Sequence, residues 1–130
     1  MSSKYTYHFS LHFNFKKDTD VKKLEKMFKI KAFKLTPLKE SKGDDEHKRA
    51  KLWYKSADFN EINVDEQIEK FTSKIFENFN GVKDLLEEFD GRAIFSLVFT
   101  SASERPIIAL TSKTIEMFGK LGFSFEVDFV

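Results

Sequence analysis

Cysteine is absent from this chain, and its absence excludes several kinds of chemistry at once. Without it the protein can form no disulfide bond, no thiolate nucleophile and no thiolate metal site. The sequence also has no apolar run approaching the ~18 residues that a membrane-spanning helix needs. The N-terminal segment MSSKYTYHFS is interrupted by polar residues, unlike the continuous apolar stretch of a signal peptide. We therefore expect a cytoplasmic protein without a membrane partner.

Motifs that bind nucleotides or activate nucleophiles are missing as well. The chain has no G-x-S-x-G elbow to present a serine, and neither phosphate-binding loop, G-x-x-x-x-G-K-[ST] or G-x-G-x-x-G. Adjacent carboxylates such as Glu87 and Glu88 fall on segments that read as surface, whereas a general acid needs burial to raise its pKa. The sequence gives no support for catalysis, and we expect no cofactor and no metal.

What the chain does contain is typical of one soluble globular domain spanning residues 1–130. Its 130 residues are 41% hydrophobic and 33% charged, which is enough apolar material for a single core and too short a chain for two. Phenylalanine occurs sixteen times and is the outlier of the composition. Because each phenylalanine buries a large apolar area, we expect a core dominated by aromatic rings.

Charge is divided unequally along the chain. The net charge is +1, yet residues 1–55 carry 15 Lys and Arg against 7 Asp and Glu, while residues 56–130 carry 7 against 14. Such asymmetry indicates either a surface for an acidic partner or two halves that attract each other. Arginine, which suits bidentate recognition of bases and phosphates, occurs only at Arg49, Arg92 and Arg105. The composition therefore argues against a nucleic-acid partner.

The N-terminal half reads as strand, helix, strand and strand. Aromatic and polar residues alternate over residues 5–15, which predicts a strand with one face on the core. A helix capped by Asp18 or Thr19 follows, with Val21, Leu24 and Phe28 on its inner side. Residues 31–35 and 51–56 read as two strands, and the charged segment 38–50 between them as an exposed loop.

The C-terminal half reads as two helical segments, two strands, a helix and a final strand. Asn63 and Glu66 form a capping box at the start of the first helix, and a short helix over 82–89 follows. We expect strands at 93–101 and 107–110, then a helix from Thr111 or Ser112 to Gly122, and an alternating strand over 123–129.

The resulting order is β-α-β-β-α-(α)-β-β-α-β. It predicts a two-layer α+β domain with helices on one face of a mixed, largely antiparallel sheet, and makes a ferredoxin-like relative plausible.

The histidines are the first candidates for a functional site. His8 and His12 lie four residues apart on one face of the first strand, about 13 Å from each other, which is too far for both to bind one metal. Glu126 and Asp128 would be the nearest further ligands if the two terminal strands pair. Solvent-exposed polar residues on an open sheet face are the alternative interpretation of all four.

Two further features indicate a binding surface. Trp53 is the only tryptophan and directly follows the charged loop that contains Lys42; tryptophan is common at binding hot spots and also in cores. Ile94, Val98 and Thr100 make the second face of a buried strand half apolar, so that a partner or a second copy could cover it. A homodimer is therefore one expectation.

The closing segment resembles a known family. Residues 110–128 are similar to the C-terminal signature of the bacterial domain-of-unknown-function 4279 family: a leucine and serine at the helix start, a Leu-Gly pair at Leu121 and Gly122, and an alternating acidic strand. Lys42 and Gly43 resemble the lysine-glycine loop of this family, and Trp53 resembles its tryptophan strand.

Two positions depart from the family pattern. Phe28-Lys29-Ile30 stands where the family tends to have leu-gly-ile, so that Lys29 replaces a glycine, and the chain closes with Phe129-Val130 instead of a tyrosine-like residue. The resemblance implies an α+β bacterial domain with no established activity.

Three hypotheses follow. The first is a small non-catalytic interaction domain, of an immunity or regulatory type, that uses His8, His12, Trp53, Lys42, Glu126 or Asp128 on the open sheet face and its neighbouring loop. The second is a metal-assisted or hydrolytic enzyme built on the two histidines and nearby carboxylates. The third is nucleic-acid binding through the basic N-terminal half.

Overall fold

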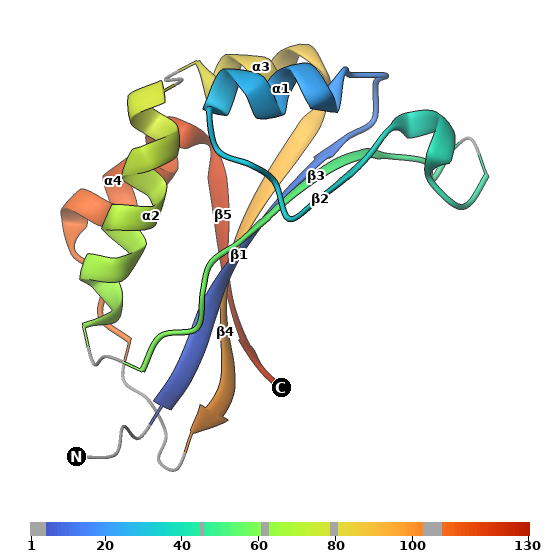
Figure 1. The fold of residues 1–130 in the computed structure, drawn as a ribbon. Coiled ribbons are helices and arrows are strands. Elements are labelled where there is room, and N and C mark those ends of the chain that lie inside the picture. Colours follow the sequence, from blue (N-terminus) through green and yellow to red (C-terminus); the bar gives the residue numbers. More distant parts are fainter. Residues whose placement is uncertain (1–4, 45, 61–62, 79–80, 103–107) are drawn as a thin grey trace.

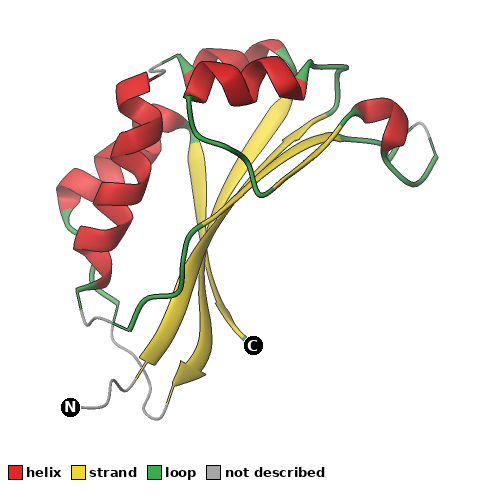
Figure 2. Cartoon of the chain, in the orientation of Figure 1, coloured by secondary structure: helices red, strands yellow, loops and turns green. Residues whose placement is uncertain are grey.

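The computed structural model describes residues 5–44, 46–60, 63–78, 81–102 and 108–130. They form one mixed five-stranded sheet with the α-helices on one face, which confirms the predicted two-layer α+β fold (Figure 1; Figure 2). The elements are β1 (Tyr5–Phe15), α1 (Val21–Phe28), β2 (Lys34–Thr36), the 3-10 helix η1 (Leu38–Glu40), β3 (Ala50–Lys55), α2 (Val64–Asn78), α3 (Val82–Glu88), β4 (Gly91–Ala102), α4 (Ser112–Leu121) and β5 (Phe123–Phe129).

The strand order is β2-β3-β1-β4-β5. β3 lies between β1 and β2, and β1 lies between β3 and β4, with antiparallel pairing throughout these four strands. This is the split β-α-β arrangement of a ferredoxin-like unit. Helix α4 and strand β5 extend it, because β5 pairs parallel with β4 and forms the second edge of the sheet.

One predicted strand is absent. Residues 107–110 were expected to be extended and paired, but 108–110 have no regular secondary structure, and residue 107 lies outside the described part of the chain. The position beside β4, the strand that precedes this segment, is occupied by β5, so the segment does not pair with β4. Ile108 and Leu110 instead pack, half-buried, against the core.

The core lies between the sheet and the helices and is rich in phenylalanine. The inward-facing residues of β1 have no exposed surface; these are Tyr7, Phe9, Leu11, Phe13 and Phe15. Their rings meet those of neighbouring elements, as where Phe9 and Phe95 lie 5.3 Å apart between ring centroids. The expected aromatic core is confirmed, and the period-two alternation in the sequence correctly assigns the two faces of β1.

Helix α1 covers the β1–β3 side of the core through Val21, Leu24 and Phe28, as the sequence predicts. Its cap is Asp20, whose carboxylate accepts the backbone N–H of Lys23 at 3.1 Å. The expected caps Asp18 and Thr19 therefore lie before the helix start. Among the described residues, no helix is both long and apolar enough to cross a membrane.

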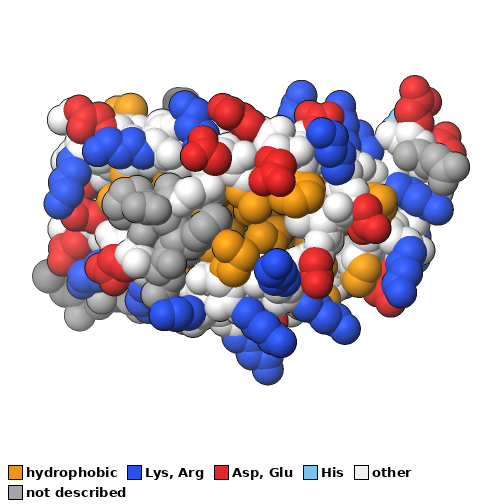
Figure 3. Space-filling model, turned by 90° about the horizontal axis from the view of Figure 1, so that it is seen from above, with side chains coloured by type: hydrophobic (Ala, Val, Ile, Leu, Met, Phe, Trp, Pro, Cys, Tyr) orange, Lys and Arg blue, Asp and Glu red, His pale blue; other side chains and the backbone are white. Residues whose placement is uncertain are grey.

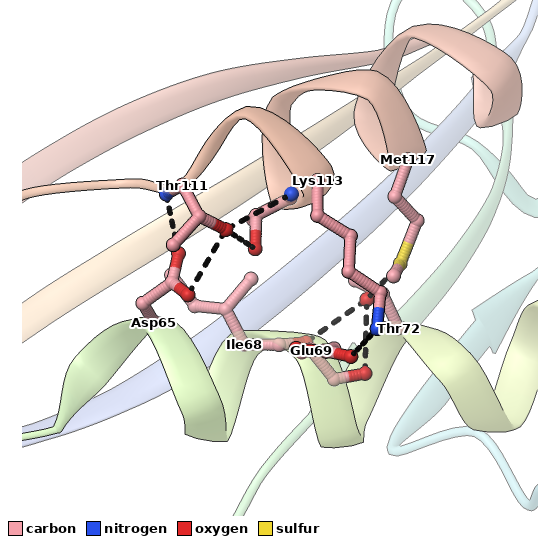
Figure 4. Close-up of polar contacts among 8 residues, drawn as sticks. Asp65, Ile68, Glu69, Thr72, Thr111, Lys113 and Met117 are labelled. Atoms are coloured by element: carbon pink, nitrogen blue, oxygen red, sulfur yellow. Dashed lines mark hydrogen bonds and ion pairs between the residues drawn. The ribbon is translucent and has the colours of Figure 1, made fainter.

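Helices α2 and α4 are joined by polar contacts between their side chains (Figure 4). Asp65 accepts the backbone N–H of Thr111 at 3.0 Å, and Lys113 pairs with Glu69 at 2.6 Å. Thr111, one of the two residues that the sequence offers as the cap, is the N-cap of α4, because its hydroxyl accepts the backbone N–H of Thr114. Thr111 therefore caps α4 and, through its contact with Asp65, also holds the start of this helix against α2.

Lys29, which ends α1, adopts the left-handed conformation with φ 57° and ψ 21°. A side chain makes this conformation costly, so Lys29→Gly is expected to raise the free energy of unfolding by about 0.5–1 kcal/mol. Lys26→Gly, inside the same helix, is the matched control and should lower it by about 1 kcal/mol. Urea denaturation measures both, and a loss of stability in Lys29→Gly would contradict the argument.

Candidate functional site

The face of the sheet that points away from the helices carries most of the predicted site residues. Lys34, Trp53, His12 and Ile94 stand side by side on it, because each is the register partner of the next across β2, β3, β1 and β4. Residues two positions away along each strand extend the same face. The open face therefore carries the strand positions that do not point into the core, and it mixes polar with apolar side chains.

Trp53 is held in a defined orientation on this face. Its indole stacks on the His12 ring with centroids 4.9 Å apart, and its Nε1–H donates a hydrogen bond to the Ser10 hydroxyl at 2.9 Å. The exposed ring of Phe33 meets it edge-on at 4.7 Å. These contacts hold the indole in one orientation, so little side-chain entropy would be lost if a molecule bound against it.

A cleft of about 430 Å³ opens beside this stack, within the size range of ligand-binding pockets. His12 and Trp53 form part of its wall, and Lys42 reaches it from the loop after η1. The remaining lining residues are Lys34, Thr36, Glu40, Ser41 and Lys51. The structure therefore brings together three of the residues singled out from the sequence.

Lys34 and Lys51 belong to the same cleft but were not candidates from the sequence. Both occupy outward-facing strand positions: Lys34 is the register partner of Trp53, and Lys51 lies two residues before Trp53 on β3. This placement is the signal that could have identified them. It depends on the pairing of β2 with β3, which local patterns do not specify. With Lys42, three lysines line the cleft, and Glu40 is the one acidic residue among its described lining residues.

His12 contributes ring surface to the cleft more than charge. Burial lowers the pKa of His12 below its usual value, the nearby Lys51 lowers it further, and Glu126 acts weakly in the opposite direction. The neutral imidazole is thereby favoured at neutral pH. The cationic character of the cleft rests on its lysines.

His8 lies further along β1 and does not line the cleft. Its Nδ1 is 3.7 Å from a carboxylate oxygen of Asp58. Burial lowers the His8 pKa, and Lys55 adds to this, while Asp58 partly opposes it. The two histidines thus have separate surroundings, as their separation along a strand requires.

Glu126 and Asp128 do not pair with the first strand. β4 separates β5 from β1, so that Glu126 is aligned with Ser96 and Ser10, and Asp128 with Val98 and His8. The sequence made these carboxylates neighbours of the histidines only on condition that the two terminal strands pair, and this condition is not met because β4 lies between β1 and β5. Within the described residues, no three His, Asp or Glu side chains are grouped closely enough to hold a metal ion.

A larger groove of about 870 Å³ runs between α2 and the segment that follows β3. Phe59 and Phe71 contribute apolar surface, and both charge signs border it; the charged lining residues are Lys55, Glu66, Glu69, Lys70, Lys74 and Glu77. None of the sequence-predicted site residues lies there. Its mixed charge gives less chemical direction than the basic cleft does.

The helical side also mixes the two signs of charge. Viewed from above, where α1 and α3 lie, basic and acidic side chains surround a hydrophobic patch (Figure 3). Met27 of α1, Leu85 of α3 and Phe89, the residue that follows α3, are half-buried hydrophobic residues. The cleft around Trp53 therefore remains the best-defined candidate site.

Comparison with known proteins returned one match. The model of a family described as Domain of unknown function (DUF4279) matches residues 3–130. No curated protein and no solved structure matches the chain.

Proposed function

This chain belongs to the DUF4279 family, whose function is unknown, and we propose that it is a non-catalytic binding domain that recognises an acidic protein partner through the cleft around Trp53. The observation that carries the proposal is that Trp53 and three lysines, Lys34, Lys42 and Lys51, line one cleft. An immunity-type protein that neutralises a toxin, or a regulatory partner protein, falls within this proposal.

The chemistry of the cleft supports an acidic occupant. Three lysines on one side of a concave surface attract carboxylates and increase the rate of encounter with a negatively charged partner. Trp53 supplies a rigid aromatic anchor of the kind that dominates binding energy at interfaces. Charge steers the partner and the indole anchors it.

The test compares charge reversal inside and outside the cleft. A Lys34→Glu, Lys51→Glu double variant inverts the cleft, whereas Lys22→Glu, Lys23→Glu makes the same charge change on exposed residues of the first turn of α1. Glutamate is favourable at a helix N-terminus, so the control should stay folded. We expect an acidic protein from native lysate to be retained by wild type and control, and about tenfold less by the cleft variant.

The single tryptophan provides a second readout. Because Trp53 is the only one in the chain, a purified partner that enters the cleft should shift the tryptophan fluorescence of the wild-type protein when the partner itself lacks tryptophan. Equal retention by all three proteins would overturn the proposal. So would retention that disappears after nuclease treatment, because nucleic acid would then be the ligand.

A further inference from the structure

The two edges of the sheet are exposed to different degrees. β2 has three residues and is followed at once by Pro37, which cannot donate to a strand ladder. β5 has seven residues and contains no proline, and within the described part of the chain it pairs with β4 alone (Figure 1). Long edge strands are templates for a further strand, and native proteins usually shorten or interrupt them. β5 is neither short nor interrupted.

The backbone groups of β5 that face outward can be identified from the ladder. The N–H of Val130 donates to the carbonyl of Phe99 on β4, at 3.0 Å. In a parallel strand, the N–H and C=O groups of alternate residues point to opposite sides. The backbone groups of Phe125, Val127 and Phe129 therefore point away from β4, toward the free edge.

The side chains of β5 define what an added strand should look like. Ser124, Glu126 and Asp128 are exposed on the open face, where the two carboxylates call for basic residues in a neighbouring strand. On the core face, Phe125 and Val127 are half-buried and Phe129 is 63% exposed, so apolar residues are favoured there. An added strand should alternate basic and apolar residues.

We propose that the edge of β5 accepts an extended segment of another protein in which lysine or arginine alternates with apolar residues. Backbone hydrogen bonds to the outward groups supply affinity, and the pattern of side chains supplies selectivity, as in other cases of strand addition. This surface lies at the opposite edge of the sheet from the basic cleft, so the inference does not depend on the proposed function.

A second copy of the chain fits this edge less well. Two β5 strands paired antiparallel about a two-fold axis at Glu126 place that carboxylate opposite its own copy, and Ser124 opposite Asp128. Like charges directly opposite each other destabilise a strand pair. In this register the acidic side chains therefore disfavour self-association, and they favour a basic partner strand.

The experiment uses the full chain and a fluorescently labelled nine-residue peptide in which lysine alternates with valine. We expect saturable binding by fluorescence anisotropy, together with slower hydrogen exchange at the amides of Phe125 and Val127. A peptide with glutamate in place of lysine should bind at least about tenfold more weakly. Equal binding of the two peptides, or no protection of these amides, would overturn the inference.

Two variants separate backbone pairing from charge. Val127→Pro removes one outward N–H without touching the ladder to β4, and should weaken binding about tenfold, whereas Val127→Ala keeps the N–H and should bind almost as wild type does. Glu126→Lys with Asp128→Lys should reverse the preference toward the glutamate peptide. If Val127→Pro does not fold, this reversal still decides, and an unchanged preference overturns the inference.

Discussion

Replacing Phe95 with alanine is expected to lower the free energy of unfolding by about 3–5 kcal/mol. Phe95 lies on β4, has no exposed surface, and meets rings from four other elements. Its centroid lies 5.3 Å from Phe9 on β1, 5.8 Å from Phe71 on α2, 5.2 Å from Phe118 on α4 and 6.2 Å from Phe125 on β5. Alanine would leave a cavity where the sheet meets two helices.

Urea denaturation followed by circular dichroism measures this loss. Phe129→Ala is the matched control, because it removes the same ring from a side chain that is 63% exposed and that stacks, among the described residues, on Phe99 alone. The control should lose less than about 1 kcal/mol, since little burial is lost. Equal losses of stability in the two variants would show that the buried ring of Phe95 contributes no more than the exposed ring of Phe129.

The second large effect is expected at Gly91, where β4 begins. An alanine Cβ at this position would stand 2.5 Å from Cδ1 and 2.8 Å from Cε1 of Phe15, and 3.1 Å from Cδ2 of Leu86. The Phe15 ring is fully buried and cannot move aside freely. Gly91→Ala should therefore lower the free energy of unfolding by about 1–3 kcal/mol through overpacking.

Gly119 provides a control with the opposite sign. A Cβ there meets no atom within 4 Å, and the residue lies inside α4, so Gly119→Ala should raise stability by about 0.5–1 kcal/mol. Combining Gly91→Ala with Phe15→Leu tests the cause: the leucine substitution should cost less in the Gly91→Ala protein than in wild type. Additive effects would contradict the proposed clash.

The basic and the acidic halves of the chain form different parts of the sheet. The basic N-terminal half builds β1, β2 and β3, and contributes Lys34, Lys42 and Lys51 to the cleft. The acidic C-terminal half builds β4 and β5, and places Glu126 and Asp128 at the other edge. The distribution of charge along the sequence reveals the asymmetry. The strand order then places the basic and the acidic residues on two different parts of one sheet.

Most elements could be predicted because their signals are local. Alternation predicts β1 and β5 and the face that each buries, and the capping residues Asn63 and Thr111 correctly mark the starts of α2 and α4. The cap of α1 was assigned one or two residues too early because Asp18, Thr19 and Asp20 are all competent capping residues. The local pattern limits the cap of α1 to a few neighbouring residues and does not identify which of them caps the helix.

The strand predicted over 107–110 shows where local patterns stop. Its apolar residues favour an extended conformation, and Ile108 and Leu110 are half-buried, but a strand also needs a neighbouring strand. The place beside β4 is taken through the parallel pairing of β4 with β5, and this pairing joins residues about thirty positions apart in the chain. The apolar residues of this segment indicate burial, whereas nothing local in the sequence specifies which strand it would pair with.

The candidate site divides in the same way. The residues of the chain establish that Trp53, His12 and Lys42 are chemically suited to recognition, and that His12 and Trp53 lie on strands. The register of β1 with β3 and β3 with β2 then sets the His12–Trp53 stack beside Lys34, while β4 keeps Glu126 and Asp128 away from the first strand. Side-chain periodicity is a property of neighbouring residues, whereas register and strand order come from contacts between distant segments, and the site depends on those contacts.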